Sequence, residues 1–373
     1  CTFSERPDFL VATFDKPSSF WKTKFAAGAG FVTTHFIGKA NFRHAEFEGR
    51  ADFVGASFQE ETDFGVARFE SQANFRGCKF QGDAGFQSAA FRAEAEFTGS
   101  TFESRTSLCD VVFEDALLVG VEGNERKSFT KTVDFTRVKL SKPQKVEFRK
   151  VDLSQFRFLE TDLREVHFTD VGWYRKNGRG RNRVFDEIYR DSTTKKPDYC
   201  LVAHLYRRLR ANFERTLLYP EAGDFYIGEM EMTRKAEKSV LKKLPLLFYN
   251  AISNYGESYY RSLCWIGAML VIFPMLFMLA GIEPTALDRG YLAEGIINYR
   301  LDFSTNESIL PTLEDWRAYR TSALYSASIF FLVRDKKFTT INNWGRLLFV
   351  LESILSPVTL AFFLLALRRR FKR

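Results

Sequence analysis

The chain lacks the residue groupings that most enzymes and metalloproteins need. Its 373 residues contain only five cysteines, and none of these stand in a Cys-x-x-Cys pair or at another metal-ligand spacing. Such a scattered, odd-numbered set is typical of reduced thiols in a cytosol-facing protein rather than of a disulfide framework. No nucleophile, base and acid occur together in a catalytic pattern. The sequence therefore predicts neither an enzyme nor a protein with a bound metal or cofactor.

Charge is distributed unevenly along the chain. Acidic residues outnumber basic ones in residues 1–120, whereas basic residues outnumber acidic ones in residues 121–261. The formal net charge of the whole chain is +8. An acidic front and a basic middle indicate a scaffold joined to a part that meets an anionic surface or ligand.

What the sequence has in excess is phenylalanine, and its 40 copies are not spread evenly. One series runs every eleven residues from Phe3 to Phe113, and a second runs every eleven residues from Phe9 to Phe97. The two series interleave, and an alanine often stands two residues before the ring. A regular repeat this short predicts a solenoid rather than a globular core. Because glycines and β-branched residues interrupt any helical stripe, the coils are predicted to be β.

The segment "ANFRHAEFEGRADFVGASF" (residues 40–58) resembles the pentapeptide-repeat family. This resemblance implies a right-handed quadrilateral β-helix over about residues 3–173, with a strict five-residue step beyond Phe148. At about 4.8 Å per coil, we expect about eight coils and a rod on the order of 40 Å long. The stretches 118–129 and 140–148 lengthen the spacing and are expected to be loops. Such a rod is either a platform for a partner or a rigid spacer.

A glycine-rich basic segment, residues 174–183, follows the last coil directly. Its cations are the candidate residues for an anionic ligand: Arg175, Lys176, Arg179, Arg181 and Arg183. Beside two aromatic residues they would suit a phosphate-rich molecule such as a nucleotide or an oligonucleotide. The alternative is a solvated linker, or a loop close to anionic headgroups.

A helical hairpin is expected in the rest of the middle region. Residues 198–218 carry apolar residues at helical spacing, "YPEAGD" (219–224) is predicted to be a turn, and a second helix is expected from Asp224 to Ser239. The stretch "AGDFYIGEMEMTRKAEKS" is similar to the segment that joins repeat domains to channel domains in bacterial pentapeptide-repeat channel proteins.

Two apolar stretches near the end of the chain are long enough to cross a bilayer. Residues 262–282 carry no charge and, at 1.5 Å per residue, span about 31 Å as a helix. The second stretch, about 347–367, stops at "RRRFKR". Lysine and arginine precede the first span and follow the second. Both chain ends are therefore predicted on the cytoplasmic side of a bacterial-type cytoplasmic (inner) membrane.

Between these spans, residues 316–333 form a shorter, interrupted apolar element that predicts a re-entrant helix. Helix, re-entrant element and helix is the layout of two-transmembrane pore-loop channels, and "NNWGRLLFVLESILSPVTLAFFLLALRRRF" resembles the inner helix of that potassium-channel-like family. The likeness covers about residues 255–373 and implies a homo-oligomeric ion channel, a homotetramer. Potassium channels place a glycine-containing filter after the pore helix. Residues 331–340, "FLVRDKKFTT", contain no glycine, so the permeating ion stays unknown.

The candidate residues of the pore or filter region are Leu332, Val333, Arg334, Asp335, Lys336, Lys337 and Glu352. The three cations among them either form a ring that favours anions or lie at the mouth with no role in permeation. An acid within a span is costly unless it faces a pore, a partner or water. Glu352 is therefore interpreted as a pore-lining charge or a link to the pore helix, with a structural hydrogen bond at a subunit contact as the alternative. Pro357 is the candidate gating hinge.

Together these features predict three regions, residues 1–173, 174–261 and 262–373, in an oligomeric ion channel gated through its cytoplasmic repeat and basic segment. Its expected partners are membrane lipid, further copies of the chain and a nucleotide or oligonucleotide regulator. Two alternatives stay open. One is a membrane-anchored scaffold that recruits a partner through the solenoid. The other is a membrane-disrupting effector of antiviral defence, controlled by a nucleotide-like ligand.

Overall fold

A computed structural model of the chain describes residues 1–121, 129–190, 196–284, 316–333, 338–340 and 342–372. The chain divides into two compact units, Cys1–Lys238 and Ser239–Arg373. The first unit holds the repeats and two helices, and the second holds four helices and a short strand pair. Each unit is described by itself.

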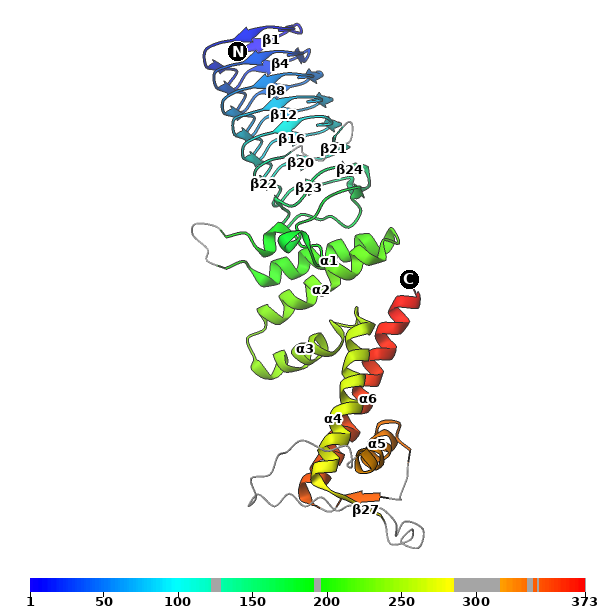
Figure 1. The fold of residues 1–373 in the computed structure, drawn as a ribbon. Helices are drawn as coiled ribbons and strands as arrows, with labels where there is room; N and C mark the ends of the chain where they lie inside the picture. Colours follow the sequence, from blue (N-terminus) through cyan, green and yellow to red (C-terminus); the bar gives the residue numbers. More distant parts are fainter. Residues whose placement is uncertain (122–128, 191–195, 285–315, 334–337, 341, 373) are drawn as a thin grey trace. The chain divides into compact units, whose positions relative to one another are not determined.

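The repeats form a β-solenoid of about seven turns, in which two-residue strands stack into four parallel sheets (Figure 1). The first sheet holds β1 (Thr2–Phe3), β4 (Lys24–Phe25), β8 (Glu46–Phe47), β12 (Arg68–Phe69), β16 (Ala90–Phe91), β20 (Val112–Phe113) and β23 (Lys139–Leu140). The second holds β2 (Thr13–Phe14), β6 (His35–Phe36), β10 (Ser57–Phe58), β14 (Lys79–Phe80) and β18 (Thr101–Phe102). The third holds β3 (Ser18–Ser19), β7 (Ala40–Asn41), β11 (Thr62–Asp63), β15 (Ala84–Gly85), β19 (Thr106–Ser107), β22 (Val133–Asp134) and β25 (Phe156–Arg157). The fourth holds β5 (Ala29–Gly30), β9 (Ala51–Asp52), β13 (Ala73–Asn74), β17 (Ala95–Glu96), β21 (Leu117–Gly120), β24 (Val146–Arg149) and β26 (His167–Thr169).

The expected solenoid is thus confirmed, with about seven turns in place of the eight expected. Its hand and its quadrilateral cross-section stay predictions. A regular coil takes 22 residues, because Thr2 pairs with Lys24. The coil that contains the expected loops is longer: Leu117 pairs with Val146, a step of 29 residues. Part of that insertion is a 3-10 turn, η1 (Pro143–Lys145), while residues 122–128 lie outside the described part of the chain.

The core of the solenoid is a set of stacked phenylalanine rings. Each ring packs flat on the ring 22 residues later; Phe31 and Phe53, for example, have centroids 4.9 Å apart and planes 5° apart. Neighbouring columns meet edge to face, as Phe42 and Phe53 do at 5.5 Å and 90°. Both geometries are favourable for aromatic pairs. The ring spacing matches the distance between hydrogen-bonded strands, so the same repeat satisfies backbone and side chains together.

Small side chains beside the rings satisfy backbone carbonyls inside the rod. Thr34 Oγ1 donates to the Phe9 carbonyl at 2.8 Å, and Cys78 Sγ donates to the Phe53 carbonyl at 3.0 Å. Burial raises the pKa of the Cys78 thiol well above its ordinary value. Cys78 is therefore a structural residue that replaces a hydroxyl, not a reactive one.

The turns of the coils use left-handed backbone at a fixed place. Positive φ recurs every eleven residues, two positions after each ring of the second series. The residues are Val11, Lys22, Thr33, His44, Gly55, Val66, Gly77, Ser88, Gly99 and Asp110. This conformation costs a non-glycine residue about 1–2 kcal/mol. The hydrogen bonds of the turn offset that cost, as when Val11 N donates to Val32 O at 3.0 Å.

Two helices close the last coil and share its core. They are α1 (Tyr199–Arg215) and α2 (Tyr219–Ala236). The Phe168 and Phe213 rings stack at 5.8 Å, and the Trp173 ring meets the Phe225 ring edge-on at 5.1 Å. The compact unit therefore runs past the expected boundary at residue 173, because the apolar core continues through α2 as far as Lys238.

The cap also satisfies the edge of the solenoid. Asn212 Nδ2 on α1 donates to the carbonyl oxygens of Leu163 and Val166 at 2.5 and 2.7 Å. An open sheet edge would expose such carbonyls and invite pairing with another chain. Because α1 covers them, the rod ends as a finished unit.

The second helix of the cap starts five residues earlier than predicted, because α2 begins at Tyr219 rather than Asp224. The predicted turn at 219–224 is therefore wrong, and the chain reverses at Thr216–Leu218, where Leu217 has φ 60°. Pro220 was interpreted as a helix breaker. In the first helical turn it stabilises the start, since no intrahelical N–H is needed there.

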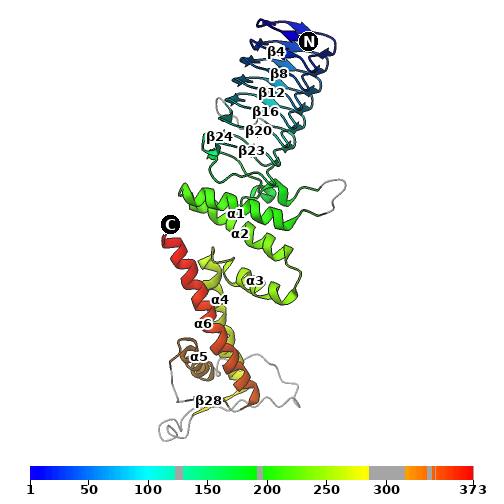
Figure 2. The ribbon, with the colours of Figure 1, turned by 180° about the vertical axis from the view of Figure 1, so that it is seen from behind.

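The second unit contains α3 (Val240–Ser253), α4 (Tyr259–Ala280), α5 (Trp316–Phe330) and α6 (Asn343–Lys372). Its strands β27 (Ile282–Pro284) and β28 (Phe338–Thr340) pair antiparallel. In both views α4 and α6 run side by side (Figures 1 and 2). The predicted apolar stretches coincide with α4, α5 and α6, whereas α3 was not predicted.

Candidate functional site: the helical unit and the basic segment

Helices α4 and α6 are both long and apolar enough to cross a membrane. They pack on each other along one side only, and many apolar side chains of both helices are exposed. These are Leu263, Trp265, Val271, Ile272, Met275, Leu276 and Leu279 on α4, and Leu347, Phe349, Val350, Leu351, Ile354, Leu364 and Leu365 on α6. A soluble protein rarely exposes so continuous an apolar surface, so these faces fit lipid or further protein.

The third helix of the group, α5, packs against both long helices. The Tyr325 ring meets the Phe277 ring of α4 edge-on at 5.0 Å. Ile329 and Phe330 are buried in the same cluster, together with Met269 and other apolar residues of α4. Apolar packing therefore holds the short helix beside the two candidate spans.

A buried hydrogen bond ties α5 to α6. Ser326 Oγ donates to Glu352 Oε1 at 2.5 Å, and both residues are fully buried. Ser322 on α5 and Ser356 and Thr359 on α6 are buried as well. Among the residues that the structure describes, Glu352 Oε2 and Ser356 Oγ have no hydrogen-bond partner. Of the alternatives for Glu352, this contact corresponds to the link to the pore helix.

The predicted filter region is described only in part. Leu332 and Val333 follow α5 and are exposed, whereas Arg334, Asp335, Lys336 and Lys337 lie outside the described residues. Phe338–Thr340 is a strand, β28, that pairs with β27 directly after α4. Pro357 lies inside the continuous helix α6. The roles assigned to these residues stay predictions.

The basic segment separates into exposed and buried cations. Arg175, Lys176 and Arg179 are exposed around the 3-10 turn η2 (Lys176–Gly178). Arg175 Nε donates to Asn182 Oδ1 at 2.8 Å. Lys176 and Arg179 form no ion pair with any residue that the structure describes. These three side chains are the part of the segment that an anionic ligand can reach.

Arg181 is instead the centre of a buried ionic network. Its guanidinium is 8% exposed and pairs with Glu187 at 2.8 Å and with Glu231 of α2 at 2.6 Å. Tyr206 OH donates to Glu187 at 2.6 Å. Arg183 contacts the same glutamate at 3.4 Å. Burial alone would raise the pKa of Glu187, but Arg181, Tyr206 and Arg183 hold it below its ordinary value. The charges of Arg181 and Arg183 are thus engaged inside the protein.

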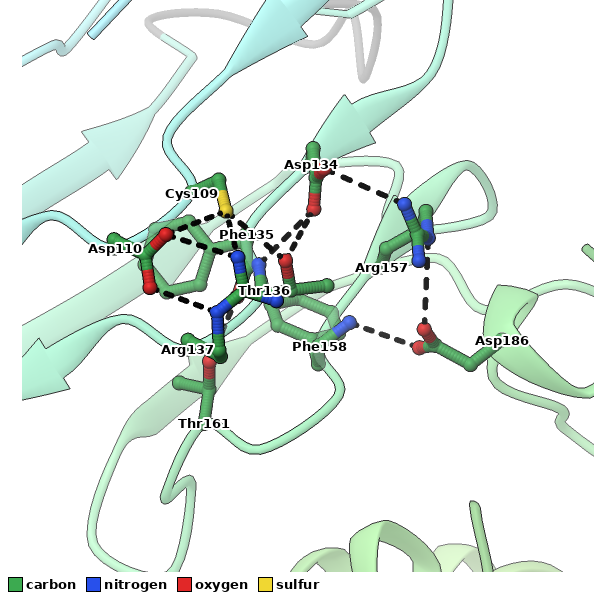
Figure 3. Close-up of polar contacts among 10 residues, drawn as sticks. All are labelled: Cys109, Asp110, Asp134, Phe135, Thr136, Arg137, Arg157, Phe158, Thr161 and Asp186. Atoms are coloured by element: carbon green, nitrogen blue, oxygen red, sulfur yellow. Dashed lines mark hydrogen bonds and ion pairs between the residues drawn. The ribbon is translucent and has the colours of Figure 1, made fainter. Parts of the chain in front are cut away.

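A second polar network joins the last coils to the 3-10 turn η3 (Phe185–Glu187) (Figure 3). Arg157 lies between Asp134, with Nη1 and Oδ2 3.3 Å apart, and Asp186, with Nε and Oδ1 4.0 Å apart. Phe158 N donates to Asp186 Oδ2 at 2.8 Å. Burial raises the pKa of Asp186 to about 7. Beside it in the figure, Arg137 binds Asp110.

An open groove of about 840 Å³ runs along the third sheet next to this network. Its acidic lining residues are Glu61, Asp63, Asp83 and Asp134, and its basic ones are Arg43, Arg105, Arg157 and Arg190. A DNA-like surface would carry charge of one sign. This groove carries both signs in equal number, which suits a polar partner rather than a basic nucleic-acid-binding protein.

Sequence comparison supports the interpretation of the rod. Residues 31–79 match the family model described as pentapeptide repeats (9 copies). The chain therefore contains pentapeptide repeats, which agrees with the stacked sheets.

One curated relative is the uncharacterized protein MJ1147 of Methanocaldococcus jannaschii, which is 30% identical over 145 residues. The match covers 33% of this chain and 30% of that protein's length. No solved structure matches the chain. The helical unit is therefore interpreted from its own geometry.

Proposed function

We propose that the protein is a homo-oligomeric ion channel of a bacterial-type inner membrane, with both ends of the chain in the cytoplasm. In this proposal the solenoid is a right-handed quadrilateral β-helix, and the basic segment passes a regulatory signal from it to the pore. Arg234 and Lys235 before α3, together with the arginines at the end of α6, favour this orientation.

The observation that carries the proposal is the position of α5. A short helix held between two candidate spans has no purpose in a simple membrane anchor, for which one span suffices. Its contacts are specific: a ring pair with α4 and a buried hydrogen bond from Ser326 to Glu352 of α6. An acid buried at that depth is costly and is retained where it has a function.

Oligomerisation follows from the same geometry. Two long helices and one short helix do not enclose a pore, and the outer faces of α4 and α6 expose apolar residues. Some of these faces contact lipid, and the others pack against further copies around a central axis. Four copies are expected from the pore-loop layout.

The direct test is electrical. Purified full-length protein in planar bilayers should give unitary currents, and well-inserted oligomer that stays silent would contradict the proposal. Glu352→Ala should alter conductance or open probability because it releases α5 from α6. Ser353→Ala, at the next position, removes only a hydroxyl that bonds within α6 and should leave the currents unchanged.

Regulation is tested with the exposed part of the basic segment. Reversing Arg175, Lys176 and Arg179 to glutamate should abolish binding of nucleotides or oligonucleotides without unfolding the cap. Isothermal titration calorimetry of the full chain with mono-, cyclic and oligonucleotides measures this. If no nucleotide binds to the wild-type chain, the regulatory part of the proposal is wrong, whereas the pore is unaffected.

A membrane-anchored scaffold is the second candidate, and the groove on the third sheet favours it. The groove has charged side chains of both signs along several successive coils. Such a face fits an extended polar partner. A chain that is monomeric or dimeric in detergent, and that conducts nothing, would favour the scaffold over the channel.

A further inference from the structure

Helix α3 has an apolar face that no other described part of its unit covers. The exposed residues are Val240 (69%), Leu241 (79%), Leu244 (54%), Leu247 (43%) and Phe248 (43%). Their spacing of one, three and four residues places them on one side of the helix. Five large apolar side chains exposed together on fourteen residues require an apolar environment.

The opposite side of α3 is fixed to the ends of both candidate spans. The Tyr249 ring stacks on the Phe362 ring of α6 at 5.0 Å. Trp265 Nε1 of α4 donates to the Ala251 carbonyl at 3.1 Å. Arg369 Nη1 near the end of α6 donates to the Tyr255 carbonyl, just after α3, at 3.1 Å. The helix is thus attached where α4 begins and α6 ends.

Figures 1 and 2 show α3 lying across the direction of the α4–α6 pair rather than along it. If the long helices cross a bilayer, a helix in this place lies in the plane of its surface. Amphipathic helices in that position bury their apolar face to about 5–10 Å, at the boundary between headgroups and acyl chains. The apolar surface of α3 then continues that of the two spans.

Charge indicates which lipids meet this surface. Lys242 and Lys243 are the only charged residues of α3, and the helix contains no acid. At the same level, Arg261 stands at the start of α4 and Arg368–Arg370 near the end of α6. Lysines near a bilayer surface favour anionic headgroups.

We propose that α3 is an in-plane interfacial helix whose apolar face enters the membrane and whose lysines bind anionic phospholipid headgroups. The inference shares with the proposed function only the requirement that α4 and α6 cross a bilayer. It does not require conduction, so a channel that fails to conduct leaves it intact.

The first test measures where α3 lies. A spin label is attached at Leu241→Cys in the full chain, with every native cysteine except the buried Cys78 replaced by serine. In liposomes of phosphatidylcholine and phosphatidylglycerol (3:1), the label should be reached by oxygen in preference to a water-soluble nickel chelate. The same label at Leu10→Cys, an equally apolar and 58% exposed site of the solenoid, should show the reverse preference.

Two outcomes overturn the proposal. A label at position 241 that behaves like the one at position 10 would place α3 in water. A label shielded from both reagents, with dipolar broadening between copies, would show that a second copy of the chain covers the face. Phe248→Cys repeats the measurement at a second exposed position, so that failure of one variant to fold does not decide the matter.

The second test measures the lipid preference. A fluorophore at position 241 should be quenched more strongly by spin-labelled phosphatidylglycerol than by spin-labelled phosphatidylcholine. Lys242→Glu with Lys243→Glu should reduce this preference by about fivefold per lysine, while the depth of the label stays the same. An unchanged preference would contradict headgroup binding. Currents recorded from the same liposomes report on the channel separately.

Discussion

The two units of the molecule treat their apolar residues in opposite ways. In the solenoid, the rings from Phe25 to Phe91 are buried to 0–1% exposure by other rings of the same chain. In the helical unit, more than a dozen large apolar side chains of α4 and α6 are exposed. The first unit contains its whole core, whereas the second presents apolar surface outward.

This difference teaches how each unit reaches stability. A repeat that stacks on itself needs nothing beyond its own neighbours and an end cap, which α1 and α2 supply. The helices of the second unit depend on lipid and, in our proposal, on further copies of the chain. Substitutions should therefore have opposite consequences at matched positions of the two units.

The largest effect is expected inside the ring stack. Phe53→Ala removes a ring held between Phe31 and Phe75 and should lower the free energy of unfolding of the first unit by about 3–5 kcal/mol. Phe3→Ala, in a half-buried ring stacked only on Phe25, is the matched control and should cost much less. Chemical unfolding followed by circular dichroism measures both. Equal losses would show that the stack does not carry the stability.

The next effect contrasts two exposed apolar side chains. Val271→Asp on α4 should weaken membrane integration by about 2.5–3.5 kcal/mol, because a carboxylate is placed in hydrocarbon. Leu10→Asp, on the surface of the solenoid, should be nearly neutral. Glycosylation-reporter insertion of α4 measures the first, and thermal unfolding measures the second. If Val271→Asp has no effect on insertion, α4 does not lie in a bilayer.

A third effect depends on pH and is confined to the solenoid unit. Asp186 has a folded-state pKa of about 7, raised by burial above its ordinary 3.8. Its contribution is therefore fully present below about pH 4 and is lost as pH rises toward 7, by on the order of 2 kcal/mol. Asp186→Asn should flatten this slope. Unfolding at pH 5 and pH 8 checks it, and an unchanged slope in the variant would assign the dependence to other groups.

The smallest effect concerns the bond between α5 and α6. Ser326→Ala should destabilise the helical unit by about 0.6 kcal/mol, the usual value for such bonds between membrane helices. Ser328→Ala, whose hydroxyl bonds only to Tyr325 O in its own helix, is the control. Unfolding in bicelles compares the two. A larger loss at Ser328 would separate the hydrogen bond from helix docking.

Regular spacing made the solenoid predictable from sequence. The phenylalanine series specified the coil length, the buried positions and the parallel stacking. The left-handed turn two residues after each ring was not predictable, because valine, lysine, histidine, serine and glycine all occupy it. There the repeated backbone hydrogen bonds decide the conformation instead of the residue type.

The charged segments were less predictable, because their partners are distant in sequence. Arg181 looked like a ligand-binding cation, yet its partner Glu231 is 50 residues away on α2. Nothing local signals that contact. Helix α3 was missed because Pro245 and two lysines interrupt its apolar pattern, although the helix runs continuously through the proline. Its stripe at helical spacing was the signal that could have revealed it.

The central claim is that the helical unit is one segment of a pore wall that other copies complete. Native mass spectrometry of the full-length chain, released from lipid nanodiscs, tests it most directly. We predict a closed oligomer of four chains that retains bound phospholipid. A monomer or dimer in the same lipid would contradict the account.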